Sequence, residues 1–257
     1  MIFSLLLALT ACGPDPFDVA IADGSVEALT TFIQENPEHK LLYMAESALE
    51  KQYGERARAA NSIEGWDEYL RRYPEGTEAE DGLRIREQLM YDRAAEANTV
   101  ESWQEFVDAY KYSNTPLKER AEQRLNVAPY LDQLTFGEVS VEPANLAENP
   151  EGEMNGFLVT ADFQNTTGKT IESLTVQIDF MSDNDGAIQT DRWPLVADRN
   201  PDRTGRTEEE KRPIRNNGRR TFSYLVEPPG VRYNEGELDE RWNNSATVTP
   251  VYVRFQE

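Results

Sequence analysis

Hydrophobic residues in the first half of the chain follow the spacing of a helix, and the pattern occurs three times. The segment Ser25 to Leu29 (SVEAL) recurs as Ser62 to Trp66 (SIEGW) and as Thr99 to Trp103 (TVESW), at an interval of 37 residues both times. The same interval separates three further apolar pairs, Phe32-Ile33, Tyr69-Leu70 and Phe106-Val107. Apolar groups therefore fall at i, i+3, i+6 and i+7, which predicts one buried stripe on each of three helices.

The ends of these helices are also marked. Ser25, Ser62 and Thr99 are residues that accept hydrogen bonds from the free amides of a helix start, and each is followed two residues later by a glutamate. Pro37 and Pro74 end the first two helices, and Asn114-Thr115-Pro116 ends the third. Longer helices are predicted in between, roughly over His39 to Arg58, Thr77 to Ala97 and Pro116 to Leu134. Residues 17–134 are thus expected to form an α-solenoid of three stacked αα-hairpins.

After Leu134 the hydrophobic period changes from that of a helix to that of a strand. Apolar and polar residues alternate over Phe157 to Phe163 and over Leu174 to Phe180, as in half-buried strands. Further strands are expected at 136–141, 187–193, 221–226 and 247–255, and Pro250 marks the last as an edge strand or a bulge. Six or seven antiparallel strands within residues 135–257 predict a β-sandwich. The fold class expected is α+β with two domains.

Two resemblances support this division. Tyr73-Pro74, after an aromatic-bearing short helix, resembles the turn of tetratricopeptide-like repeats in bacterial envelope proteins, although the period is 37 rather than about 34. That resemblance implies a scaffold that binds other envelope proteins through its helical repeats. The run Asn165 to Ile171, followed by a strand and Asp185-Gly186, is similar to small immunoglobulin-like domains of bacterial surface lipoproteins.

The N-terminus carries an apolar run from Ile2 to Ala11, which is too short for a bilayer crossing of about 20 residues but has the proportions of a signal peptide. The run ends in Leu9-Thr10-Ala11-Cys12 and resembles a bacterial lipobox, which implies cleavage after residue 11 and lipid attachment at Cys12. Residues 12–16 would then be a lipidated tether. The alternative is a buried cysteine after an ordinary helix, which Gly13 to Pro16 would break.

The same resemblance implies a cellular location. With Gly13 after the lipidated residue, the pattern is similar to that of lipoproteins sorted to the outer membrane, facing the periplasm or the cell surface. The first residues Met1-Ile2-Phe3 lack the usual positive charge, and a Gram-positive owner remains an alternative.

The amino-acid composition limits which partners, metal sites and catalytic residues the chain can have. The 257 residues include 26 Lys and Arg against 47 Asp and Glu, a net charge of −21, which argues against a nucleic-acid partner. One Cys and one His allow neither an intrachain disulfide nor a multi-histidine metal site, so no metal or cofactor is expected. His39 falls in a predicted turn, and no phosphate-binding glycine loop, CxxC pair or HExxH helix occurs. No catalytic residue is predicted, although a glycan hydrolase that uses two carboxylates stays an alternative.

The segment 197–220 is long and without periodicity, and it concentrates positive charge. Its eight cations are Arg199, Arg203, Arg206, Lys211, Arg212, Arg215, Arg219 and Arg220. Loops of this length are normally functional or disordered, so these residues are candidate contacts for an anionic partner such as lipid phosphates or an acidic protein. The alternatives are a solvated loop, or a loop resting on the chain's own helical half, residues 17–134, whose net charge is −11.

Two further features have competing interpretations. Asp183 to Gly186 offers oxygen ligands at alternate positions, but a four-residue hairpin turn is favoured over a calcium loop. The aromatic residues Trp66 and Trp103 share the repeat position of Leu29, which favours core packing over ligand binding. The function expected is that of a membrane-anchored, non-catalytic, protein-binding or scaffolding lipoprotein of the bacterial envelope. A glycan-binding or lipid-binding envelope module is the alternative.

Overall fold

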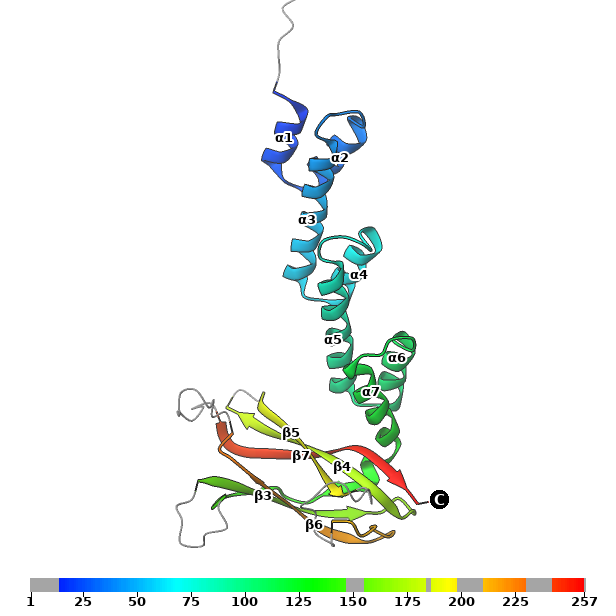
Figure 1. The fold of residues 1–257 in the computed structure, drawn as a ribbon, viewed down its shortest axis with the longest axis vertical. Helices are drawn as coiled ribbons and strands as arrows, with labels where there is room; N and C mark the ends of the chain where they lie inside the picture. Colours follow the sequence, from blue (N-terminus) through cyan, green and yellow to red (C-terminus); the bar gives the residue numbers. More distant parts are fainter. Residues whose placement is uncertain (1–13, 147–154, 184–185, 198–209, 230–241, 257) are drawn as a thin grey trace, which may run out of the picture. The chain divides into compact units, whose positions relative to one another are not determined.

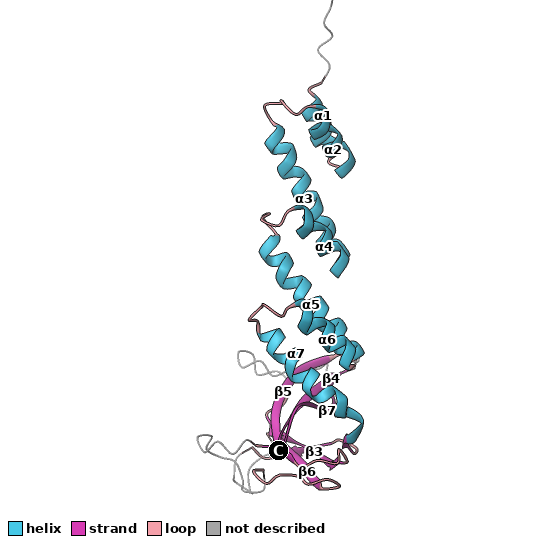
Figure 2. Ribbon diagram, turned by 90° about the vertical axis from the view of Figure 1, so that its right-hand side faces the viewer, coloured by secondary structure: helices cyan, strands magenta, loops and turns pink. Residues whose placement is uncertain are grey.

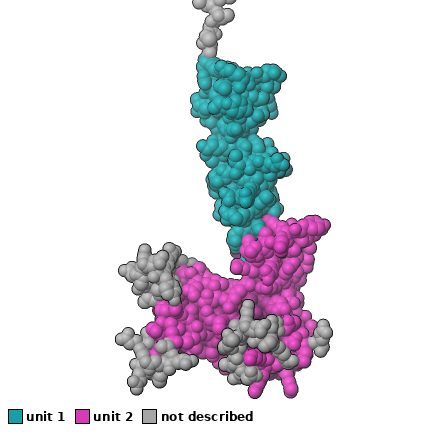
Figure 3. Space-filling view, in the orientation of Figure 1, with its two compact units in different colours: residues 1–93 teal, residues 94–257 magenta. Residues whose placement is uncertain are grey.

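A computed structural model describes residues 14–146, 155–183, 186–197, 210–229 and 242–256. The chain is α+β, with helices in its first half and antiparallel sheets in its second (Figures 1 and 2). It divides into two compact units, residues 1–93 and residues 94–257 (Figure 3). The predicted domain limits follow the change from helix to strand, whereas the division between the compact units falls within a helix.

The helices alternate between short and long. The short helices α2 (Val26–Glu35), α4 (Ile63–Arg72) and α6 (Val100–Ala109) each have ten residues, and their starts lie 37 residues apart. The longer helices α3 (Leu42–Ala60), α5 (Ala79–Ala97) and α7 (Pro116–Val127) start at the same interval. An eight-residue helix, α1 (Pro16–Asp23), precedes them. The sequence period is therefore the spacing of the helix starts.

The predicted caps of the short helices are confirmed. Ser25 Oγ accepts from the Ala28 amide at 3.1 Å, and Ser62 Oγ accepts from the Gly65 amide at 3.1 Å. Thr99 forms a reciprocal pair in which its Oγ1 accepts from the Ser102 amide while Ser102 Oγ accepts from the Thr99 amide. One residue before each cap the backbone is left-handed, at Gly24, Asn61 and Asn98. These residue types tolerate that conformation best, so each turn is specified locally.

The repeat position held by Leu29, Trp66 and Trp103 is fully buried, which confirms that the two tryptophans are core residues. In the middle repeat, Trp66 packs with Tyr53, Ala57 and Tyr69. A methyl group at Gly82 would lie 2.7 Å from the Trp66 ring, so α5 approaches the indole more closely than any side chain would allow.

Two antiparallel sheets lie in the second unit. In the first, β3 (Gly156–Asn165) pairs with β1 (Leu134–Phe136) and β2 (Ser140–Ala144) along one edge and with β6 (Arg219–Val226) along the other. In the second, β4 (Ile171–Ser182) lies between β5 (Ala187–Val196) and β7 (Trp242–Phe255). The apolar residues of both sheets form one buried cluster that includes Phe163, Phe180 and Phe222. The alternating patterns that predicted strands at 157–163 and 174–180 are confirmed.

Pro250 lies in β7, an edge strand, where the register with β4 shifts between Thr175 and Val176. The expectation of an edge or a bulge at this proline is confirmed, because both are present.

The last helical segment joins the β core. The helix predicted over Pro116 to Leu134 ends instead at Val127, and a 3-10 helix, η1 (Ala128–Gln133), follows with Pro129 in its first turn. Val127 is buried in the same cluster as the strands. Asn126 Oδ1 accepts from the Val253 amide at 3.1 Å, and the Arg124 guanidinium donates to Gln177 Oε1 at 2.8 Å. The helix α7 therefore belongs to the same compact unit as the sheets.

Candidate functional site

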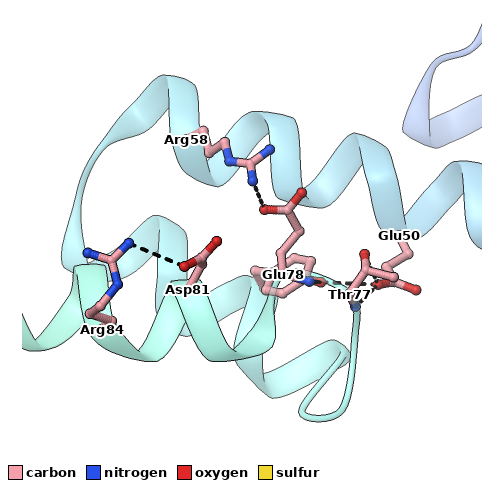
Figure 4. A network of polar contacts seen from close by, with 7 residues as sticks. Glu50, Arg58, Thr77, Glu78, Asp81 and Arg84 are labelled. Atoms are coloured by element: carbon pink, nitrogen blue, oxygen red, sulfur yellow. Dashed lines mark hydrogen bonds and ion pairs between the residues drawn. The ribbon is translucent and has the colours of Figure 1, made fainter.

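A polar network in the first compact unit, residues 1–93, which we call the helical unit, centres on Glu50 (Figure 4). Its Oε1 accepts from the Thr77 amide at 2.6 Å, from the Thr77 hydroxyl at 2.9 Å and from the Tyr69 hydroxyl at 3.1 Å. Tyr69 Oη in turn accepts from the Glu78 amide at 3.0 Å, and Glu78 forms an ion pair with Arg58. The network therefore connects α3, α4 and the turn before α5.

The electrostatics of this network favour a structural role. Burial works against the charge of Glu50, but hydrogen bonds from Thr77 and Tyr69 outweigh it and lower the pKa of the carboxyl. Burial raises the pKa of the Tyr69 hydroxyl, and the neighbouring Glu50 raises it further. Both groups are thus held in their ordinary protonation states at neutral pH. A methyl group at Gly76 would lie 2.6 Å from Tyr69 Oη and 2.7 Å from Glu50 Oε1, so the turn closes directly over the network.

His39 lies in the turn before α3, where the sequence predicted it. Its Nδ1 accepts from the Leu41 amide at 3.2 Å, and its Nε2 lies 3.1 Å from Asp15 Oδ1. The imidazole stacks on Phe17 and meets the Phe32 ring edge to face. Both ring nitrogens are therefore engaged in holding the turn.

A groove of about 580 Å³ lies between α1 and α2. Val19, Ala28 and Phe32 are among the apolar residues that line it. Three carboxylates line it as well, those of Asp23, Glu27 and Glu35. An apolar surface beside several carboxylates can receive an amphipathic segment that carries basic residues, so this groove is a candidate docking surface.

Two turns of the β region meet at the fully buried side chain of Asn165. Its Nδ2 lies within hydrogen-bond distance of three backbone carbonyl oxygens, at 2.9 Å from Lys169 and 3.1 Å from both Ile214 and Arg215. Its Oδ1 accepts from the amide and the hydroxyl of Thr167. This side chain fastens the turn after β3 to the turn before β6.

Several predicted cations lie on or beside these turns. Arg212, Arg215 and Arg219 are exposed, and Lys211 is half-buried. The exposed Lys169 lies on the facing turn and was missed by sequence reasoning, because its distance from the basic segment along the chain conceals their proximity. The signal available in the sequence was that Lys169 lies in a turn, Thr167-Gly168-Lys169. Arg199, Arg203 and Arg206 lie outside the described residues.

Arg219 and Arg220 are adjacent in the sequence but differ in role, and both belong to β6 rather than to a loop. Arg220 pairs with the inward-facing Phe163, and its guanidinium donates to the carbonyls of Leu195 at 3.1 Å and Arg212 at 2.6 Å. Arg219 pairs with Gln164 on the outer face of the sheet, and its side chain is exposed. Only Arg219 of this pair is therefore presented for contact with a ligand.

A second link between β5 and β6 is made by Tyr224, whose hydroxyl donates to Asp191 Oδ2 at 3.0 Å. Burial, and then the Asp191 carboxylate, raises the pKa of this tyrosine far above its usual range. Together with Arg220, it connects the edge strands of the two sheets. Tyr224 and Arg220 therefore have a structural role.

The remaining predicted sites lie wholly or partly outside the structure. Cys12 is outside the described residues, and so are Asn184 and Asp185 of the predicted hairpin turn. Within the described ranges, no three or more His, Cys, Asp and Glu side chains gather as a metal site would require. In the same part of the chain, none of the helices combines the length and apolarity needed to cross a bilayer.

Comparison with known proteins adds little to this picture. No protein-family model and no curated protein matches the chain. A solved structural-genomics target, SoR45 of the Northeast Structural Genomics Consortium, aligns over 49% of this chain and 87% of its own, with 13% identity and a TM-score of 0.23. The Pseudomonas fluorescens alkylpurine DNA glycosylase AlkC, bound to DNA containing an abasic site analog, aligns over 82% of this chain and 57% of its own, with 9% identity and a TM-score of 0.27. At these TM-scores neither alignment defines a shared fold.

Proposed function

We propose that this chain is a membrane-anchored, non-catalytic lipoprotein that binds or scaffolds other proteins of the bacterial envelope. The anchor is a lipid on Cys12, and the location is the outer membrane. The helical region acts as a tetratricopeptide-like solenoid, and the β region is an immunoglobulin-like sandwich. The observation that carries the proposal is the groove between α1 and α2, because an apolar surface beside several carboxylates is suited to a protein segment.

The packing of the charged groups supports a binding role. The Glu50 carboxylate and the His39 imidazole are occupied by contacts within the chain, which leaves neither arranged as an acid or base for a substrate. The groove, in contrast, presents exposed carboxylates at Glu27 and Glu35. The partner segment we propose is therefore amphipathic and basic.

Site-specific photo-crosslinking in cells tests this role. A photoreactive side chain at Thr31, which lines the groove, is expected to give one defined crosslinked product. A matched probe at Glu55, exposed on α3 outside the groove, is expected to give none. The additional substitution Ala28→Trp should abolish the Thr31 product because the indole fills the groove. Equal products from both positions, or a Thr31 product that survives Ala28→Trp, would contradict the proposal.

The anchor is tested separately. We expect Cys12→Ala to abolish incorporation of radiolabelled palmitate and to leave the protein either uncleaved or free of the membrane, because two or more acyl chains are needed for stable attachment. Ser4→Ala, a change within the same apolar segment, should leave labelling intact. Unchanged labelling of Cys12→Ala would refute lipid attachment at this residue.

A further inference from the structure

The outer face of the first sheet carries two rows of polar residues that run across three segments. Thr135 of β1, Gln164 of β3 and Arg219 of β6 form the first row, because Gln164 is the register partner of both others. In the second row, Asp162 of β3 pairs with Thr221 of β6, and the Thr221 hydroxyl donates to Asp162 Oδ1 at 2.8 Å. Side chains directly opposite on adjacent strands lie about 5 Å apart, so the two rows form one compact array.

The array has an open corner at Gly137. This residue follows β1, and its amide donates to the Asp162 carbonyl at 2.8 Å, so it occupies the place beside Asp162 in the second row. Because it has no side chain, the surface is hollow above that point. The array, Gly137 and Phe136 are among the residues that line a pocket of about 510 Å³. Small-ligand sites have volumes of roughly 300–1,000 Å³.

The two arginines that line this pocket differ in whether their guanidinium groups are hydrogen-bonded within the protein. Arg220 contributes to its wall, but its guanidinium is held by two backbone carbonyls. The Arg219 guanidinium has no hydrogen-bond or ion-pair partner among the described residues. Its planar set of donors suits a carboxylate, which it can bind through two parallel hydrogen bonds.

We propose that this pocket binds an acidic saccharide, with Arg219 on the sugar carboxylate and the array on its hydroxyl groups. A sugar ring presents several hydroxyls that both donate and accept. The pocket offers an acceptor at Asp162, a donor and an acceptor at Gln164, and hydroxyls at Thr135 and Thr221. An acyl chain would leave these polar groups unsatisfied, which excludes it as the ligand. The site is separate from the α1–α2 groove and goes beyond the scaffolding role.

Isothermal titration of the purified chain with a galacturonic-acid tetramer and with N-acetylmuramic acid tests the proposal. We expect at least one of these acids to bind with a Kd on the order of 1 mM, as is reasonable for one small open site, and a neutral galactose tetramer to bind more weakly. Arg219→Gln should weaken binding of the acid about tenfold, which corresponds to about 1.4 kcal/mol.

Two matched variants make the result specific. Arg215→Gln removes the same charge from an exposed position outside the pocket and should change the Kd less than about twofold. Gly137→Leu should abolish binding by filling the hollow while leaving the thermal unfolding midpoint unchanged, since the nearest atom to an added Cβ lies 3.6 Å away. The proposal is overturned if neither acid binds, if both arginine variants lose affinity equally, or if the neutral tetramer binds as tightly as the acids.

Discussion

Two polar side chains connect segments of this chain through several hydrogen bonds each. Asn165 lies in the β region and Glu50 in the helical unit, and each joins segments that are far apart along the chain. Asn165 donates to the backbone carbonyls of Ile214 and Arg215, and Glu50 accepts from the amide and hydroxyl of Thr77 and from the hydroxyl of Tyr69. A buried or half-buried side chain that satisfies several polar groups is costly to replace, because those partners lose their hydrogen bonds.

At this scale we expect Glu50→Gln to destabilise the helical unit. The amide can retain one acceptor oxygen but loses the charge that strengthens the three hydrogen bonds to Oε1, so the expected loss is about 1–2 kcal/mol in the free energy of unfolding. Urea unfolding followed by circular dichroism measures it. Glu55→Gln, an exposed change on the same helix, should shift the midpoint little.

The pH dependence of stability, compared between wild type and Glu50→Gln, tests whether the lost charge causes the destabilisation. The pKa of Glu50 is lowered in the folded chain, so its contribution is fully present above the pKa of an unfolded glutamate and disappears as the pH falls through the lower, folded value. The difference in stability between wild type and Glu50→Gln should therefore shrink on acidification below about pH 4. A difference that stays constant down to pH 2 would assign the effect to packing.

At the scale of elements, the short helices are specified by local signals. In each repeat a left-handed residue is followed by a capping hydroxyl and then by ten helical residues. These signals lie within a few residues of one another, so they could be recognised without knowledge of the tertiary structure. The same is true of the strands around Phe163 and Ile178, whose alternation reflects one buried and one half-buried face.

Other features depend wholly or partly on distant contacts. The helix predicted to reach Leu134 stops at Val127 partly because of Pro129, a local signal that the prediction did not use, and partly because Tyr130 and Leu131 pack against the β core. Arg220 was grouped with the exposed cations, yet its pairing with Phe163 turns it inward. Lys169 was overlooked since only the fold brings its turn to that of Arg215.

The caps provide a prediction at this scale. Ser62→Ala should reduce the free energy of unfolding by about 1 kcal/mol, because the Gly65 amide loses its acceptor at the start of α4. Ser62→Asp keeps an acceptor and should restore most of the stability. Chemical denaturation of the three proteins measures the effect, and equal stability of Ser62→Ala and wild type would show that packing alone specifies this helix start.

At the scale of the whole molecule, the compact units and the predicted domains lead to different truncation experiments. Because Arg124, Asn126 and Val127 contact the sheets, a fragment of residues 94–257 should unfold in a single cooperative transition. A fragment of residues 135–257 removes those contacts, exposes part of the core and should be less stable or aggregate. Calorimetry of both fragments tests this, and identical transitions would show that α7 is dispensable for the stability of the two sheets.

The common interval of the helix starts also affects how the gene can change. The caps at Ser25 and Ser62 occupy equivalent places, and so do the starts of α3 and α5. Recombination between two such places would duplicate or delete a complete helical pair in register, with every cap and core position preserved. The length of the helical region could thus evolve in whole steps, while the strands that follow keep their own sequence unchanged.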